Sequence, residues 1–194
     1  MAKTLTAIFV VALIIITGFF FFNNYIYEEK QADAAENYRD VEFVISGERV
    51  KLVNGVAQTE TAFGQASKTT VRYFGNEAKG DLSGDLVPDI AFLITQETGG
   101  SGTFFYLVGA IQNAHGTYTG TEAVLIGDRI APQTTEYRSF SGIPGGYLIV
   151  NYAERAPGEP MTARPSVGKS IWLKLDPKAM QFGELVQNFE GEAR

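Results

Sequence analysis

From residue 41 onward, short runs of β-branched and aromatic residues alternate with Gly, Pro, Asn and Asp. This pattern predicts strands joined by tight turns. Residues 41–45 and 49–53, separated by Ser46-Gly47-Glu48, predict a hairpin, and Asn54-Gly55 predicts a second turn. Further predicted strands cover residues 70–74, 89–95, 103–111, 123–126, 134–138, 147–152 and 170–175.

Two of these runs, 90–94 and 104–108, are almost entirely apolar. A strand of this kind is typically covered on both faces, so we expect the two to form a central pair joined by the Gly-rich residues 98–102. Asp176-Pro177 predicts an N-cap and first turn for a short helix over 178–180. The expected fold is mainly β: one antiparallel sandwich or barrel-like domain over residues 41–194, with little helix.

The N-terminal part has a different pattern. Residues 5–22 (LTAIFVVALIIITGFFFF) carry no charge and as a helix would span about 27 Å, close to the apolar thickness of a bilayer. Lys3 precedes this run and Glu28 follows it, which predicts a single-pass anchor in the cytoplasmic membrane with the N-terminus inside and the C-terminal domain outside. Residues 1–27 are thus the cytoplasmic tip and anchor, and residues 28–40 a polar stalk.

A cleaved signal peptide is the alternative, since Ala32-Asp33-Ala34 has the small-x-small pattern of a cleavage site. The apolar run is longer than the core of an ordinary signal peptide, and the alanines lie well beyond its end. The uncleaved anchor is therefore the favoured interpretation, and the lipid bilayer is the first predicted partner.

Charge and composition exclude several classes of function. Without Lys3, the chain beyond the anchor has 15 Lys and Arg (16 − 1) against 22 Asp and Glu, a net charge of −7. An acidic domain without a basic cluster is a poor nucleic-acid binder. The absence of cysteine removes disulfides, thiol nucleophiles and Cys-ligated zinc.

The stretch GDLSGDLVPD places oxygen groups at alternate positions: Asp81, Ser83, Asp85, the Val87 carbonyl and Asp89. Odd-numbered spacing of this kind turns oxygens toward a hard cation, so these five residues are the candidate ligands of a Ca²⁺ ion. The alternative is a pair of Asp- and Ser-stabilised turns leading into a strand. Leu86 stands where calcium loops usually have glycine, and Gly84 is the residue that could take over the sharp turn.

This stretch resembles the calcium loops of FG-GAP repeats and, more loosely, those of dockerins and EF-hands; the resemblance implies that the odd positions bind calcium. A longer succession is similar to a group of bacterial proteins that have an N-terminal anchor and no assigned activity. It includes RYFGNEAKGDLSGDLVPDIAFLITQETGGSGTFFYLV, IGDRIAPQTTE and NYAERAPGEPMTARPSVGKSIWL. That resemblance implies an exported domain.

Two Pro-containing segments near residues 127–132 and 154–166 display charged groups on rigid loops and form the candidate recognition surface. Its residues are Asp128, Arg129, Glu154, Arg155, Glu159 and Arg164. The alternative is that these charges form ion pairs that hold the loops to the sheet. His115, the only histidine, is expected in an exposed turn, and no catalytic residue is assigned.

These patterns favour a membrane-anchored binding or structural module of the cell envelope, with an envelope protein or glycan as ligand. A hydrolase that uses the paired carboxylates of Glu154 and Glu159 is the first alternative. A small inhibitor of envelope enzymes is the second.

Overall fold

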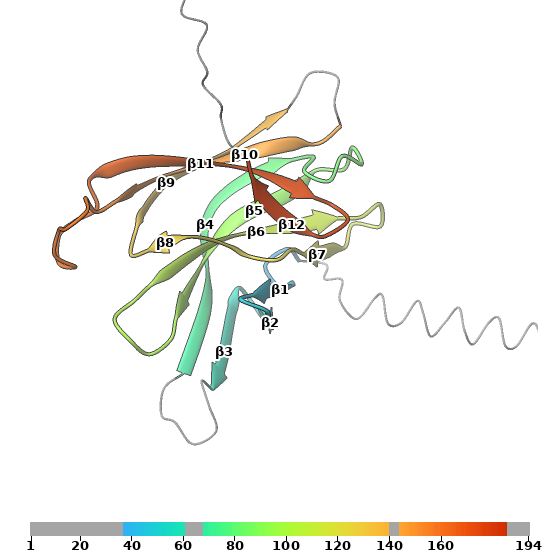
Figure 1. Cartoon of the computed structure of the whole chain (residues 1–194). Coiled ribbons are helices and arrows are strands. Elements are labelled where there is room, and N and C mark those ends of the chain that lie inside the picture. Colours follow the sequence, from blue (N-terminus) through green and yellow to red (C-terminus); the bar gives the residue numbers. More distant parts are fainter. Residues whose placement is uncertain (1–36, 61–67, 140–143, 186–194) are drawn as a thin grey trace, which may run out of the picture. The chain divides into compact units, whose positions relative to one another are not determined.

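The computed structural model describes residues 37–60, 68–139 and 144–185. The predicted membrane segment 5–22 and most of the predicted stalk lie outside these residues. The described residues form strands and turns without a helix, so the mainly β fold is confirmed (Figure 1). Nowhere in these three ranges is there a helix with the length and apolar character to cross a membrane.

Every pair of hydrogen-bonded strands is antiparallel. The strands are β1 (Glu42–Ile45), β2 (Glu48–Lys51), β3 (Val56–Glu60), β4 (Lys68–Gly80), β5 (Asp89–Glu97), β6 (Phe104–Gln112), β7 (Tyr118–Gly120), β8 (Val124–Asp128), β9 (Ala131–Ser139), β10 (Gly146–Glu154), β11 (Val167–Asp176) and β12 (Gln181–Glu184).

Three sheets are stacked in this domain. The largest has the order β3-β4-β5-β6-β7, with β8 also paired to β6; the second has the order β12-β11-β10-β9; the third is the β1-β2 hairpin. Figure 1 shows β10 and β11 above β5 and β6, and the β1-β2 hairpin below these two strands. Side chains of β5 and β6 pack against the sheet of β9 to β12 on one face and against the hairpin on the other. The large sheet is therefore the middle layer.

Burial in β5 and β6 follows from this central position. Ala91, Leu93 and Leu107 face the sheet of β9 to β12, where Leu148, Val150 and Leu173 complete one core. On the other face, Phe92 and Val108 pack against Phe43, Ile45 and Val50 of the hairpin. The predicted central pair with two covered faces is confirmed, because successive side chains of each strand enter different cores.

Tight turns occur where the sequence predicts them. Ser46 and Gly47 both have positive φ between β1 and β2, and Asn54 and Gly55 do the same before β3. Two successive residues of positive φ define the two-residue hairpin turn whose twist matches the strands, and Asn-Gly suits it best.

Three short strands were not predicted: β3, β7 and β12. All lie at or near the edge of a sheet and contain few large apolar residues. The predicted helix over 178–180 is wrong. The Asp176 carboxylate does accept the N–H groups of Lys178 and Ala179, as an N-cap would. Met180 then adopts a positive φ of 54°, and the chain returns as β12 alongside β11.

Glycines allow the two large sheets to approach. A Cβ on Gly80 would lie 2.4 Å from the ring of Tyr137, and one on Gly109 would lie 3.1 Å from Phe182.

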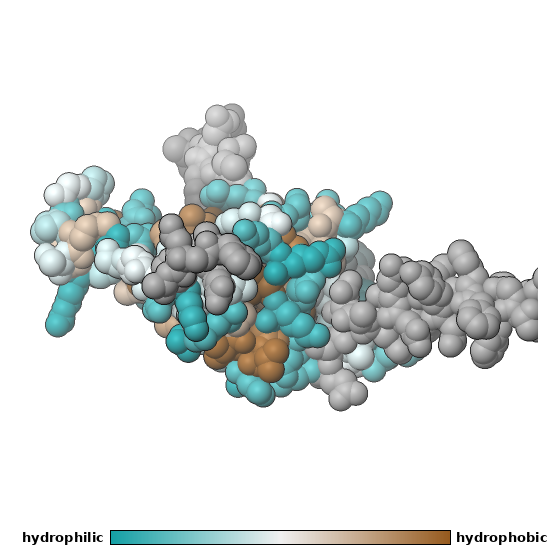
Figure 2. Space-filling model, turned by 90° about the horizontal axis from the view of Figure 1, so that it is seen from below, coloured by the Kyte–Doolittle hydropathy of each residue, from teal (hydrophilic) through white to brown (hydrophobic). Residues whose placement is uncertain are grey.

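Figure 2 views the domain from the side of β3 and the lower end of β4, a mostly hydrophilic face with a small hydrophobic patch. The buried apolar residues form two clusters between the layers.

Candidate functional site

The Asp81–Asp89 loop is organised by a buried carboxylate. Asp89, at the start of β5, has no exposed surface. Its Oδ2 accepts the N–H groups of Leu82 (2.8 Å) and Ser83 (2.9 Å), and its Oδ1 accepts that of Gln112 at the end of β6 (2.9 Å). Burial raises the pKa of Asp89, although the three N–H groups act in the opposite direction. One side chain therefore joins the loop to two central strands.

The other two aspartates hold the loop itself. Asp81 Oδ1 accepts the N–H groups of Gly84 (2.6 Å) and Asp85 (3.1 Å), and its Oδ2 accepts that of Leu86 (3.2 Å). Asp85 Oδ1 accepts the N–H of Val87 (2.8 Å). These are the short-range carboxylate-to-backbone bonds typical of Asp-stabilised turns.

The loop's conformation agrees with the expected need for a sharp turn. Gly84 (φ 86°) and Leu86 (φ 70°) both adopt left-handed backbone conformations, and the Leu86 side chain is 84% exposed. Over the ranges that the structure describes, no three His, Asp or Glu side chains converge closely enough to hold a metal ion. The hydrogen bonds thus match the turn alternative, and calcium binding stays a prediction.

The same loop also bridges the two large sheets. The Tyr137 hydroxyl of β9 donates to the Asp81 carbonyl (3.1 Å), and Leu82 is buried in the core between the sheets. A Cβ on Gly84 would lie 3.3 Å from Pro144, just before β10. The aspartates therefore hold the loop in the place where it contacts both large sheets.

Three residues of the predicted recognition surface meet at another corner. Arg129 donates through Nε to both carboxylate oxygens of Asp128 (3.0 Å each) and through Nη2 to Oδ2. Arg155, just after β10, donates from Nη1 to the Arg129 carbonyl (3.3 Å). The hydrogen bonds from Arg129, with the charges of both arginines, lower the pKa of Asp128.

The backbone at this corner is fixed as well. Arg129 N donates to the Thr103 carbonyl (2.7 Å), and Thr103 N donates to Asp128 Oδ1 (3.1 Å). Arg129 has a positive φ of 49°, which is uncommon for a residue with a side chain. We call the group of Thr103, Asp128, Arg129 and Arg155 the arginine corner.

The other predicted surface residues lie elsewhere in the domain. Glu154 forms an ion pair with Lys169 on β11 (3.4 Å), and Glu159 accepts the Ala156 N–H within the β10–β11 connection (2.9 Å). Arg164 is exposed in the same connection. His115 lies in an exposed turn that is closed by Asn113, whose side chain accepts the His115 N–H (2.9 Å).

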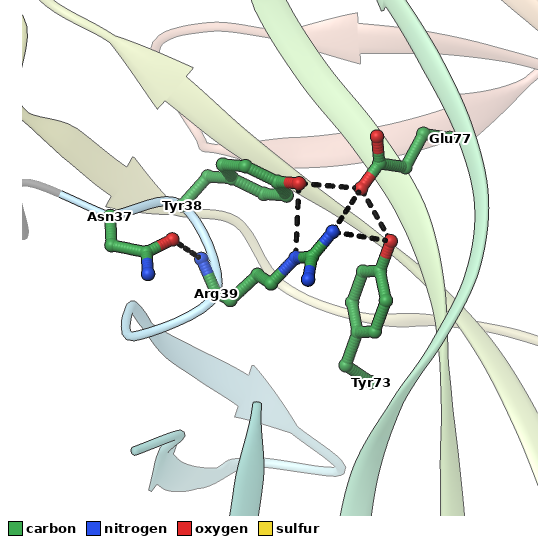
Figure 3. A network of polar contacts seen from close by, with 5 residues as sticks. All are labelled: Asn37, Tyr38, Arg39, Tyr73 and Glu77. Carbon is green, nitrogen blue, oxygen red and sulfur yellow. Dashed lines mark hydrogen bonds and ion pairs between the residues drawn. The ribbon is translucent and has the colours of Figure 1, made fainter. Parts of the chain in front are cut away.

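A third cluster, shown in Figure 3, was not predicted. Glu77 on β4 accepts hydrogen bonds from the hydroxyls of Tyr38 (2.7 Å) and Tyr73, and Arg39 Nη2 lies 3.4 Å from the same carboxylate oxygen. The Arg39 guanidinium lies over the Tyr73 ring, 4.3 Å from its centroid. We call these four residues the N-terminal clasp.

The N-terminal clasp joins the last residues of the predicted stalk to the domain. Tyr38 also packs edge-on against Phe92 of the core, and Gly55 N donates to the Arg39 carbonyl (3.2 Å). Desolvation and the bond to Glu77 raise the pKa of Tyr73 to about 12. Spacing could not reveal this cluster, because Arg39 and Glu77 are 38 positions apart.

Comparisons with protein-family models, curated proteins and solved structures find no significant match for this chain.

Replacing Asp89 should be far more costly than replacing Asp85. Asp89→Ala removes the acceptor of three N–H groups in a buried position, at about 1–3 kcal/mol for each one left unpaired. Asp85→Ala removes one exposed turn bond, worth about 1 kcal/mol. The melting temperature of Asp89→Ala should therefore be well below that of Asp85→Ala. Equal melting temperatures would contradict the role of Asp89.

The N-terminal clasp should make stability fall at alkaline pH. Between pH 10 and about 12 an unfolded Tyr73 has lost its proton whereas the folded one keeps it, so the stabilisation is complete below pH 10 and is lost as pH rises toward 12. The difference between the urea unfolding midpoints at pH 9 and pH 11 should therefore be smaller in Tyr73→Phe than in the original chain. Tyr147→Phe, on the other sheet, controls for removal of one hydroxyl; an unchanged difference in Tyr73→Phe would refute the assignment.

Proposed function

We propose that the chain is a membrane-anchored, extracytoplasmic binding or structural module of the cell envelope. The observation that carries the proposal is the uncharged run 5–22 followed closely by a β-sandwich. In this proposal the segment 5–22 crosses the cytoplasmic membrane as a helix and the acidic domain lies outside.

The N-terminal clasp supports this arrangement. The chain reaches the domain at residues 37–40, and Arg39 is held there by Tyr73 and Glu77 of the middle sheet. Because the N-terminal clasp holds the chain at Arg39, only a short segment would separate the domain from the proposed membrane anchor. The arginine corner is the part of the domain that we assign to ligand recognition.

The hydrolase alternative gains no support from the described contacts. Glu154 is paired with Lys169, and Glu159 closes a turn of its own loop. A glycosidase needs two carboxyl groups that face each other across a substrate. The inhibitor alternative stays a prediction that co-purification with a stoichiometric envelope enzyme would support.

The membrane assignment is tested with the full chain in a bacterial host. A C-terminal phosphatase reporter that folds only outside the cytoplasm should be active, and the protein should stay in the membrane fraction after alkaline carbonate washing. The double variant Val11→Arg/Ile14→Arg should lose both properties, because each central arginine costs about 2.5–3.5 kcal/mol on insertion. An inactive reporter on a stable fusion would overturn the proposal.

Calcium is a separate part of the proposal, supported by the oxygen spacing from Asp81 to Asp89. For a weak extracellular site with a Kd of about 1 mM, 10 mM calcium would stabilise the fold by about 1.4 kcal/mol and raise Tm by about 3–6 °C. Asp85→Asn should abolish this rise, whereas Asp176→Asn at the β11–β12 turn should keep it. Equal melting temperatures in calcium and in chelator would leave the loop as a turn only.

A further inference from the structure

The arginine corner contains two guanidinium groups and one paired carboxylate. Arg129 occupies both oxygens of Asp128, and no carboxylate in the described ranges forms an ion pair with Arg155. The corner therefore carries one excess positive charge, within a chain whose formal net charge is −6.

This excess charge is partly withdrawn from water. The Arg129 side chain is 23% exposed and the Asp128 side chain 30%. Arg155 is partly buried, and its Nε is buried without a hydrogen-bond partner among the described residues. A partly buried guanidinium whose charge no carboxylate matches favours an anion, because the anion neutralises that charge.

The corner is also preorganised by the fold. Its residues lie just before β6, at the β8–β9 turn and just after β10, and two hydrogen bonds, Arg129 N to the Thr103 carbonyl and Thr103 N to the Asp128 carboxylate, join the first two segments. The left-handed conformation of Arg129 presents its carbonyl to Arg155. Uncommon backbone conformations that the surroundings enforce are concentrated at binding sites.

We propose that the arginine corner binds an oxyanion, the carboxylate or phosphate group of an envelope ligand, and that Arg155 makes the principal contact. The planar fork of an arginine matches either group in a two-bond geometry. The source of the ligand rests on the proposed envelope function, whereas the binding itself does not depend on where the protein is located.

The test uses the purified full chain in a non-ionic detergent, titrated with sodium phosphate and separately with sodium acetate at constant ionic strength. Binding is followed by calorimetry, and folding of each variant is checked by its melting temperature. Saturable binding of either anion supports the proposal. The anion that binds identifies the group of the ligand as a phosphate or a carboxylate. Binding of neither anion overturns the proposal, even if the membrane experiment succeeds.

Arg155→Gln is the informative variant, because glutamine can still donate to the Arg129 carbonyl while the charge is removed. It should weaken anion binding at least about tenfold, and Arg155→Lys should weaken it less. Arg138→Gln removes a cation that is paired with Glu136 on β9, away from the arginine corner, and should leave binding unchanged. Equal affinity in Arg155→Gln and the original chain would exclude Arg155 as the contact.

Discussion

The bonding of the Asp89 carboxylate is the constraint on which the arrangement of the layers depends. A carboxylate without exposed surface is costly, and its three backbone N–H partners compensate that cost. These partners lie in the Asp81–Asp89 loop and at the end of β6. The carboxylate therefore fixes the position of the loop relative to β5 and β6. The loop then carries Leu82 into the core and meets Tyr137 of β9, so Asp89 contributes, together with the apolar core, to fixing how the middle sheet joins the sheet of β9 to β12.

The central layer explains why the fold was largely predictable. Continuous apolar runs at 90–94 and 104–108 have few alternatives to a strand covered on both faces, and Asn54-Gly55 has few alternatives to a tight turn. The short strands β3, β7 and β12 carry no such signal, and each is held by pairing with a longer neighbouring strand. Around Asp176 the local cap was predicted correctly, but tertiary pairing turned the chain into a hairpin where the cap alone favoured a helix.

The candidate sites were predictable only in part. The spacing of Asp81, Asp85 and Asp89 indicated a loop organised by carboxylates. It could not tell a bound cation from backbone N–H groups, because both interact with the same carboxylate oxygens. Prolines and charges marked Asp128, Arg129 and Arg155, yet the same pattern also selected Glu154 and Glu159, which the fold places in other contacts. The N-terminal clasp depends on pairing between residues far apart in the sequence, so it is visible only once β4 is placed beside residues 37–40.

The position of the N-terminal clasp has a mechanical consequence. Tension applied through the residues before Asn37 would reach Tyr73 and Glu77 of β4 before it reached the β1-β2 hairpin, because Arg39 precedes that hairpin in the chain. The load would then reach the thirteen-residue strand β4 before the four-residue strand β1, which could otherwise be peeled away from one end.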